Sequence, residues 1–426
     1  FRHYTAGIGQ SEDWLSLLGF LHMFKRLATY LLLGSLAQLP LVQAEIQPEQ
    51  SGVESLGKHD GQHWFWLWGN RAPSMIDGRA LLFNDSGNML GQLDTGFWFN
   101  SLLPAPARNE LFSVETYFSR GTRGERSDLV TVYDPLTLSP KREIAIPAKR
   151  INALGNTGVS VLSDDERFLL VLNYTPAQSI SIVDLDTDRF VGEVETPGCA
   201  SIYPAGKRDF YSICGDGSFL HLRLDDQGQV LLKERSQPLF DPLQDLLSTA
   251  ASRIGDTWYF VSRENYVYAV QMSADQLQLS NKWSLLSADE REDDWRISGV
   301  QHTAVHIDSG RLFVLMHQGA AQTFQEPGTH VWVYDVQAAQ KVQALKLEEL
   351  GLSIGVSQGA QPRLYSLDFV LPMPYLAQVW VYLSEGNDGV LRRLQQELNI
   401  YDADTGKHLR TVNGLPYGYL NMVLPW

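Results

Sequence analysis

A hairpin whose turn begins with an aspartate recurs along this chain of 426 residues. In the copy at 330–345 (HVWVYDVQAAQKVQAL), aromatic and β-branched residues precede the aspartate and a second short run follows it. Side chains alternate along a strand, so Val331 and Val333 are expected on one face and Trp332 and Tyr334 on the other. Aspartate suits the turn because its carboxylate accepts hydrogen bonds from nearby backbone amides. One hairpin alone is marginal in water, so its repetition determines the fold.

Seven copies can be recognised, with turns marked by Asp85, Asp134, Asp184, Asp225, Gln271, Asp335 and Asp402. A period of about 40–50 residues with several short strands per unit is typical of the blades of a β-propeller. We therefore predict an all-β fold over residues 62–426, a seven-bladed β-propeller of four-stranded blades. The ring would be closed by the N- and C-terminal strands, with the aromatic run at 63–68 completing the last blade. The alternative is a set of unrelated hairpins in a sandwich, and only 241–250 resembles a helix.

The first 61 residues are expected to lie outside the propeller. Residues 1–22 show no clear pattern and are interpreted as an upstream, non-native extension, so that Met23 would be the true start. Residues 23–44 have two basic residues, an apolar run and small residues before a cleavage point, which is typical of a secretory signal peptide. The alternative is a membrane anchor, but the apolar run is shorter than the roughly 20 residues that a span needs. Residues 45–61 are expected to be a flexible segment.

Cys199 and Cys214 are the two cysteines of the chain. Export to an oxidising compartment favours a disulfide between them, and two buried thiols are the alternative. The motif for covalent c-type haem attachment is absent from the sequence. The net charge of −15 argues against binding to nucleic acid or to an anionic membrane surface.

No stretch of the sequence predicts a self-sufficient active site, so no catalytic residue and no metal ligand is assigned. The motif Gly355–Gly359 (GVSQG) matches a hydrolase nucleophile elbow, but a turn and a strand follow it where the elbow requires a helix. His59 and His63 lie four residues apart without neighbouring carboxylates, which does not favour a metal site. The acidic run at 289–294 (DEREDD) is expected to be a solvated loop.

The exported part of the chain is similar to the large (heavy) subunit of the quinoprotein amine dehydrogenases, which act on methylamine or aromatic amines. The similarity covers essentially all of residues 60–424. It is carried by Gly96–Phe97, 123–140 (RGERSDLVTVYDPLTLSP), the block at 197–218 with both cysteines, 288–306 (ADEREDDWRISGVQHTAVH), 315–335 (LMHQGAAQTFQEPGTHVWVYD) and 400–412 (IYDADTGKHLRTV).

This resemblance implies a periplasmic enzyme that oxidatively deaminates primary amines to aldehyde and ammonia. In the family, tryptophan tryptophylquinone is carried by a small subunit, and electrons pass to a blue-copper protein of the amicyanin or azurin type. The large subunit binds no cofactor, docks the small subunit and forms one wall of the substrate channel, in an assembly of two large and two small subunits. The alternative function is a periplasmic propeller that binds or scaffolds other proteins without a redox partner.

One residue role follows from the resemblance. The phenylalanine after glycine in the first blade gates the channel to the quinone in the family, and here this is Phe97. The alternative is that Phe97 only packs the blade with its aromatic neighbours. The chain departs from the family in residues 319–326 (GAAQTFQE) and in an insertion at 370–394. Both departures bear on which amine and which electron acceptor are used.

Overall fold

The computed structural model describes residues 54–57, 63–70, 76–152, 155–368, 383–384, 396–415 and 419–426. The chain divides into the units Phe1–Val53 and Glu54–Trp426, and all of the described residues lie in the second. The expectations for the signal peptide, for His59 and for most of the 370–394 insertion therefore fall outside the described residues.

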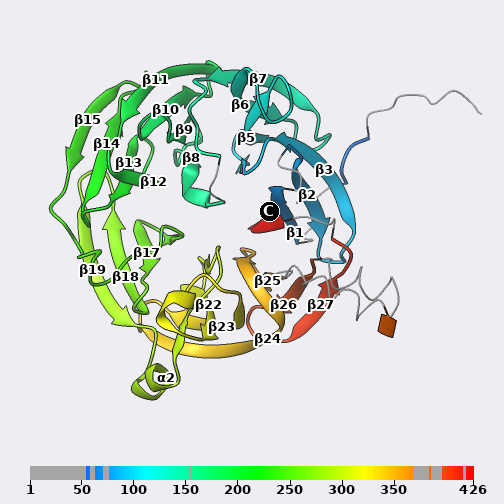
Figure 1. Cartoon of the computed structure of the whole chain (residues 1–426), viewed down its shortest axis with the longest axis vertical. Helices are drawn as coiled ribbons and strands as arrows, with labels where there is room; N and C mark the ends of the chain where they lie inside the picture. Colours follow the sequence, from blue (N-terminus) through cyan, green and yellow to red (C-terminus); the bar gives the residue numbers. More distant parts are fainter. Residues whose placement is uncertain are drawn as a thin grey trace, which may run out of the picture. The chain divides into compact units, whose positions relative to one another are not determined.

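Residues 64–425 form antiparallel sheets that lie around a common centre, as in a β-propeller (Figure 1). Five of the sheets have four strands. The first is built in the order β28-β1-β2-β3 and the second in the order β4-β5-β6-β7. Their bounds are β28 (Tyr419–Pro425), β1 (Trp64–Asn70), β2 (Gly78–Asn84) and β3 (Met89–Gly96), then β4 (Ser101–Ala105), β5 (Glu110–Phe118), β6 (Arg126–Tyr133) and β7 (Pro140–Ile146).

Three further four-stranded sheets follow along the chain, and each contains four consecutive strands. They comprise β8 (Ser160–Leu162), β9 (Phe168–Asn173), β10 (Ser179–Asp184) and β11 (Arg189–Glu195); β12 (Cys199–Pro204), β13 (Asp209–Cys214), β14 (Phe219–Leu224) and β15 (Val230–Arg235); and β16 (Ser252–Ile254), β17 (Thr257–Val261), β18 (Tyr266–Met272) and β19 (Leu277–Ser284).

The last sheet has eight strands, because one long strand takes part in two sets of pairings. The strands are β20 (Trp295–Ile297), β21 (Thr303–His306), β22 (Arg311–Gln318), β23 (Gly328–Asp335), β24 (Gln340–Val356), β25 (Arg363–Asp368), β26 (Leu398–Asp402) and β27 (His408–Val412). The first part of β24 pairs with β23 and its last part with β25, and Gly351 pairs with both. The prediction of seven separate four-stranded blades is therefore wrong, because β24 continues through Gly351 without a break and joins two sets of strands into one sheet.

The prediction for the aromatic run at 63–68 is also corrected. β1 does lie beside a strand that follows Asp402, the C-terminal strand β28, but together with β2 and β3 these strands form the first sheet and not the last blade. Both faces of β1 are buried. Trp64, Trp66 and Trp68 pack towards the second sheet, whereas Phe65 and Leu67 pack towards β25–β27. A strand covered on both faces needs no polar alternation, which explains why the run is aromatic throughout.

The predicted hairpins are present, and most of their turns use the aspartate as expected, whereas at Asp85 the neighbouring Asn84 side chain accepts the backbone N–H. Asp134 and Asp335 each accept two backbone N–H groups at 2.9 Å, from the residues two and three positions further on. The predicted faces of β23 are also confirmed, because Val331 and Val333 pack in a different cluster from Trp332 and Tyr334. The marker Gln271 lies inside β18 and not in its turn.

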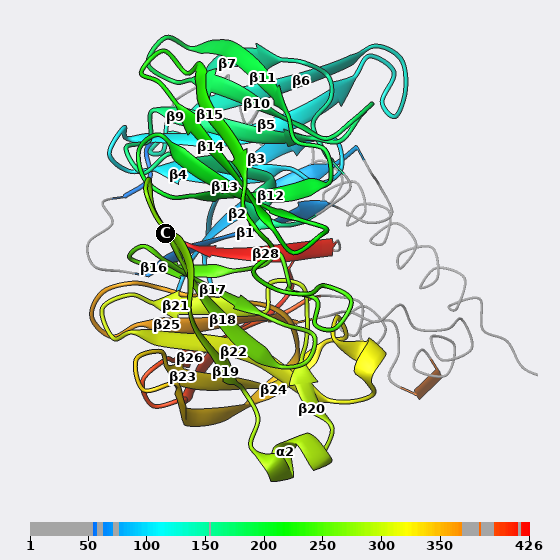
Figure 2. The same cartoon turned by 90° about the vertical axis from the view of Figure 1, so that its left-hand side faces the viewer.

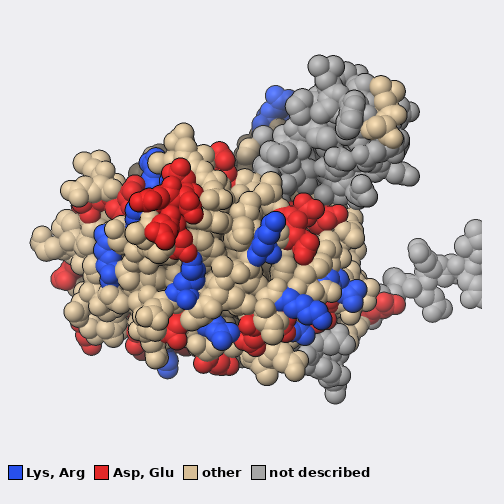
Figure 3. All heavy atoms as spheres, turned by 90° about the horizontal axis from the view of Figure 1, so that it is seen from below, with Lys and Arg blue, Asp and Glu red and all other residues tan. Residues whose placement is uncertain are grey.

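Helices are short in the described part of the chain. They are the 3-10 turns η1 (Thr157–Val159) and η2 (Ala321–Thr323) and the helix α2 (Ala288–Glu292). The run at 289–294 was predicted to be a loop, but its first part is helical because Ser287 and Glu290 form a capping box. Figure 2 shows α2 projecting beyond the strands. The segment 241–250 forms turns and no helix. Figure 3 shows one face of the molecule, where acidic and basic side chains are interspersed.

Candidate functional site

The connections between the sheets gather at one face, which we call the upper face. Strands alternate in direction within each sheet. In a four-stranded sheet of this kind, the second and third strands are joined at one face of the molecule. The segment that leads from the fourth strand to the next sheet lies at that same face. This face includes the β3–β4, β7–β8 and β15–β16 connections and the loops β17–β18 and β22–β23. Residues far apart in sequence meet there.

Phe97 begins the β3–β4 connection on the upper face and is half-exposed. Its N–H donates to the carbonyl oxygen of Thr116 at 2.8 Å, and its ring packs edge-on against Phe118 with the ring centroids 5.0 Å apart. Gly96 precedes it with φ +77°, and a Cβ atom there would lie 2.7 Å from the Thr116 oxygen. Glycine is thus required by both backbone conformation and space. The structure fixes the position of the Phe97 backbone.

Arg150 holds the β3–β4 connection at Phe99. Its guanidinium donates to the carbonyl oxygen of Phe99 at 3.0 Å and to the hydroxyl of Thr116 at 2.7 Å. The side chain is fully buried, and this burial lowers the pKa of Arg150 to about 10, while the nearby Asp128 acts to raise it. Arg150 therefore remains a cation at neutral pH, and its charge is balanced by a carboxylate that Arg126 also contacts at 2.8 Å. Phe97–Phe99 is tied to the sheet at both ends.

A second buried ionisable group lies nearby in β5. Glu115 is 1% exposed and accepts hydrogen bonds from the hydroxyls of Thr131 at 2.7 Å, Tyr117 at 2.9 Å and Tyr133 at 3.1 Å. Burial raises the pKa of Glu115, and the hydroxyl groups act in the opposite direction. The ring of Tyr117 lies against Gly96. This cluster supports the same turn that carries Phe97.

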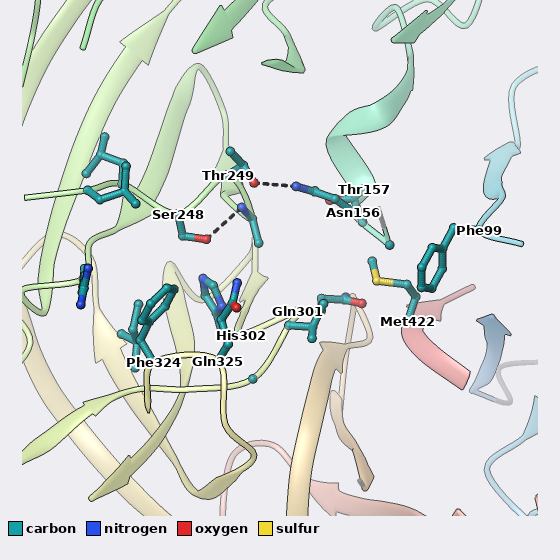
Figure 4. A pocket seen from close by; sticks show the side chains of 18 residues that line it. Phe99, Asn156, Thr157, Ser248, Thr249, Gln301, His302, Phe324, Gln325 and Met422 are labelled. Carbon is teal, nitrogen blue, oxygen red and sulfur yellow. Dashed lines mark hydrogen bonds between the residues drawn. The ribbon is translucent and has the colours of Figure 1, made fainter. Parts of the chain in front are cut away.

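A cavity of about 490 Å³ opens at the centre of the upper face, and we call it the axial cavity. Phe99 and Met422 line one side, and Phe324, Gln325 and His302 line another (Figure 4). Asn156 donates to the hydroxyl of Thr249 at 2.6 Å across the β7–β8 and β15–β16 connections. The remaining lining residues are Gly155, Thr157, Leu246, Leu247, Ser248, Ala250, Arg263, Ile297, Gly299, Val300 and Gln301. Phe97 is not among them, whereas Phe99 is.

The structure shows the predicted disulfide between Cys199 and Cys214, which are directly opposite each other in β12 and β13. The hydrolase motif does not form an elbow. Gly355 and Val356 end strand β24, and the buried hydroxyl of Ser357 accepts the N–H of Arg363 at 2.8 Å. Among the described residues, no three His, Cys, Asp or Glu side chains are arranged to hold a metal ion.

Sequence reasoning missed Arg150, Glu115 and the axial cavity. A buried arginine and a buried glutamate have no local signature, because their partners come from other strands. The loop 319–326, singled out as a departure from the family, does contribute Phe324 and Gln325 to the cavity.

Comparison with known proteins identifies the family. Residues 75–371 match the family model described as methylamine dehydrogenase heavy chain. The chain belongs to the methylamine dehydrogenase heavy chain family. The heavy chain of Paracoccus versutus is 30% identical over 350 residues, which cover 80% of this chain and 75% of the relative. The heavy chain of Methylorubrum extorquens is 26% identical over 348 residues, covering 81% and 77%. The family match thus includes Phe97 and ends where the 370–394 insertion begins.

Solved structures of other proteins share the fold of this chain. A putative 6-phosphogluconolactonase from Bacteroides fragilis superposes with a TM-score of 0.54 at 10% identity, covering 87% of this chain and 99% of the other. A protein from Lactobacillus plantarum gives a TM-score of 0.53 at 10% identity, with coverages of 86% and 99%. At such identities the likeness concerns the propeller fold alone. In the described residues, no helix is long and apolar enough to span a membrane.

Proposed function

We propose that the chain is the large subunit of a periplasmic amine dehydrogenase that converts primary amines to aldehyde and ammonia. The observation that carries the proposal is the family match over residues 75–371, which includes the Phe97 turn. The disulfide between Cys199 and Cys214 supports export, because such bonds persist in oxidising compartments. The large subunit would act with a small subunit that carries tryptophan tryptophylquinone, in an assembly of two large and two small subunits.

In this proposal the quinone of the small subunit would accept the electrons of the amine, and a blue-copper protein of the amicyanin or azurin type would then receive them. The described residues of this chain would contribute to the shape of the substrate channel. Phe97 would stand at the mouth of the substrate channel, where a rigid ring selects substrates by their size. Thr116 holds the Phe97 backbone and Arg150 holds that of Phe99 two residues on, so that the ring keeps its position while amines pass.

Co-expression with the neighbouring genes tests the proposal. We expect a small subunit to co-purify with the chain and the complex to show quinone absorbance that an added amine bleaches. Recovery of the folded chain without a small subunit and without quinone absorbance would contradict the proposal and favour a propeller that only binds or scaffolds other proteins. Addition of a blue-copper protein to the reduced complex should restore the quinone absorbance.

A further inference from the structure

The axial cavity has a distinctive charge pattern. The chain as a whole has 49 acidic and 34 basic residues, yet none of the described residues that line the cavity is an aspartate or glutamate. Among these described lining residues, Arg263 alone carries a formal charge at neutral pH. A cavity that contains a cation and lacks carboxylates attracts anions and repels ammonium ions. It is therefore poorly suited to the amine that the proposed enzyme would oxidise.

The guanidinium of Arg263 is oriented without a carboxylate partner among the described residues. It lies over the ring of Phe324, 5.3 Å from the ring centroid. Two arginines in nearby strands behave differently. Arg223 contacts Asp209 at 2.7 Å, and Arg253 contacts Asp164 at 2.7 Å. Stacking on an aromatic face holds a guanidinium in place and leaves its N–H groups in the ring plane free to bind an anion.

His302 provides an independent observation. It is 5% exposed, and within the described residues neither ring nitrogen makes a hydrogen bond of normal geometry, although the backbone of Gly299 lies close enough to act on the ring. Burial lowers the pKa of His302 to about 4, although the backbone of Gly299 acts slightly in the other direction, so the imidazole is neutral at pH 7. A neutral imidazole offers one donor and one acceptor, and buried polar groups are normally satisfied. Figure 4 shows His302 among the lining side chains, on the same side as Phe324 and Gln325.

The rest of the lining is mainly apolar and includes Phe99, Leu246, Ile297 and Met422. A volume of about 490 Å³ is within the range of sites for small organic ligands. Apolar walls with a few convergent polar groups are the usual composition of such sites. The polar groups define the ligand's charged end, and the apolar walls define its body.

We propose that the axial cavity binds a small organic carboxylate with an apolar or aromatic body. Arg263 supplies the positive charge for the carboxylate, His302 supplies a hydrogen bond, and the side chains of Phe99 and Met422 contact the apolar body. The site is separate from the amine channel proposed at Phe97, and its existence does not depend on the oxidation of amines.

Calorimetric titration of the full chain, with any subunit that co-purifies, tests this proposal with benzoate as the probe. Benzamide and benzylamine have similar bodies but lack the negative charge. We expect saturable binding of benzoate, much weaker binding of benzamide and no detectable binding of benzylamine. Absence of saturable benzoate binding, or equal binding of all three compounds, would overturn the proposal.

Variants locate the binding. Arg263→Gln should weaken benzoate binding about tenfold or more, because it removes a charge-assisted hydrogen bond. Arg120→Gln is the matched control, because Arg120 is exposed on the β5–β6 loop of the same face and does not line the cavity. It should bind benzoate like the unmodified chain. His302→Leu should also weaken benzoate binding, and if this buried variant does not fold, the Arg263 variant alone decides. Equal benzoate affinity in Arg263→Gln and Arg120→Gln would overturn the assignment.

Discussion

The guanidinium of Arg150 donates a hydrogen bond to the carbonyl oxygen of Phe99 at 3.0 Å, from a residue that lies 51 positions further along the chain. This contact fixes the connection that starts at Phe97. Residues with no contact to the substrate can thereby control the position of the proposed gate.

The first prediction concerns Arg150→Met. The substitution keeps most of the side-chain volume but removes the donors to Phe99 and to the hydroxyl of Thr116. We expect the free energy of unfolding to fall by about 2–3 kcal/mol, because buried acceptors lose a charged partner while Asp128 keeps Arg126. Urea denaturation measures this loss. Arg120→Met, at an exposed position, should leave the midpoint unchanged.

Gly96→Ala should disturb the same turn from its other end. Alanine disfavours φ +77°, and its Cβ atom would lie 2.7 Å from the carbonyl oxygen of Thr116. We expect a loss of about 1–3 kcal/mol in the free energy of unfolding. Gly192→Ala is a useful control, since a Cβ atom there meets no neighbour within 4 Å. Equal stabilities of the two variants would show that the Gly96 turn is not constrained.

Phe97→Ala should change amine selectivity and leave folding intact, because the side chain is half-exposed. We expect the ratio of kcat/KM for long and short amines to change by about tenfold, the magnitude that pocket shape usually controls. The comparison variant is Tyr174→Ala, which removes a ring that is 58% exposed on the β9–β10 loop of the same face. Unchanged kinetics of Phe97→Ala across short and long amines would argue against the gate.

Removal of the disulfide should lower stability. The bond between Cys199 and Cys214 closes a loop with a sequence separation of 15. On the chain-entropy model, replacement of both cysteines by alanine should cost about 3 kcal/mol in the free energy of unfolding. Reduction of the unmodified protein should lower the urea midpoint in a similar way. The double variant should not respond to the reductant, and a response would point to an effect unrelated to the disulfide.

Asp368 should make stability depend on pH. Burial raises the pKa of Asp368 to about 7. The hydrogen bond from the Glu397 backbone acts to lower it, and the charges of Glu397 and Glu349 act to raise it. Its pKa in the folded chain thus exceeds its unfolded value near 4, so the contribution to stability is present below about pH 4 and is lost as the pH rises through 7.

Asp368→Asn removes this titration and keeps an oxygen to accept the N–H of Glu397, a bond of 2.7 Å. The difference in the free energy of unfolding between the variant and the unmodified chain should therefore grow by about 1–3 kcal/mol from pH 5 to pH 8. Urea denaturation at both pH values measures the difference. A difference in the free energy of unfolding that is the same at both pH values would contradict the raised pKa of Asp368.

The sequence contains enough information to predict the hairpins but not how they join. The aspartates at the turns and the alternating strands are local, so β23 and its turn at Asp335 could be predicted residue by residue. The continuity of β24 is different. It depends on Gly351 pairing with strands on both sides, and no local sequence pattern distinguishes this from the end of one strand and the start of another.

The candidate site divides in the same way. The disulfide was predictable from two cysteines in a chain whose sequence predicts export, and Phe97 follows from a resemblance to a family. The axial cavity is not predictable from local sequence, since its lining comes from segments between Phe99 and Met422 that only the folded ring of sheets brings together. Likewise His302 and Arg263 are unremarkable in the sequence. Among the described residues, His302 makes no hydrogen bond of normal geometry and Arg263 has no carboxylate partner, and only this distinguishes them.

The pairing of β1 with β28 has a consequence for the order of events during biosynthesis. β1 precedes the other described strands in the sequence, but one of its edges stays without a partner until residues 419–425 have also been made. Until then, a strand rich in tryptophan presents unpaired backbone groups to other chains, which invites aggregation. The growing chain therefore depends on protection of β1 until β28 has been made, and chaperones that bind aromatic segments would act there.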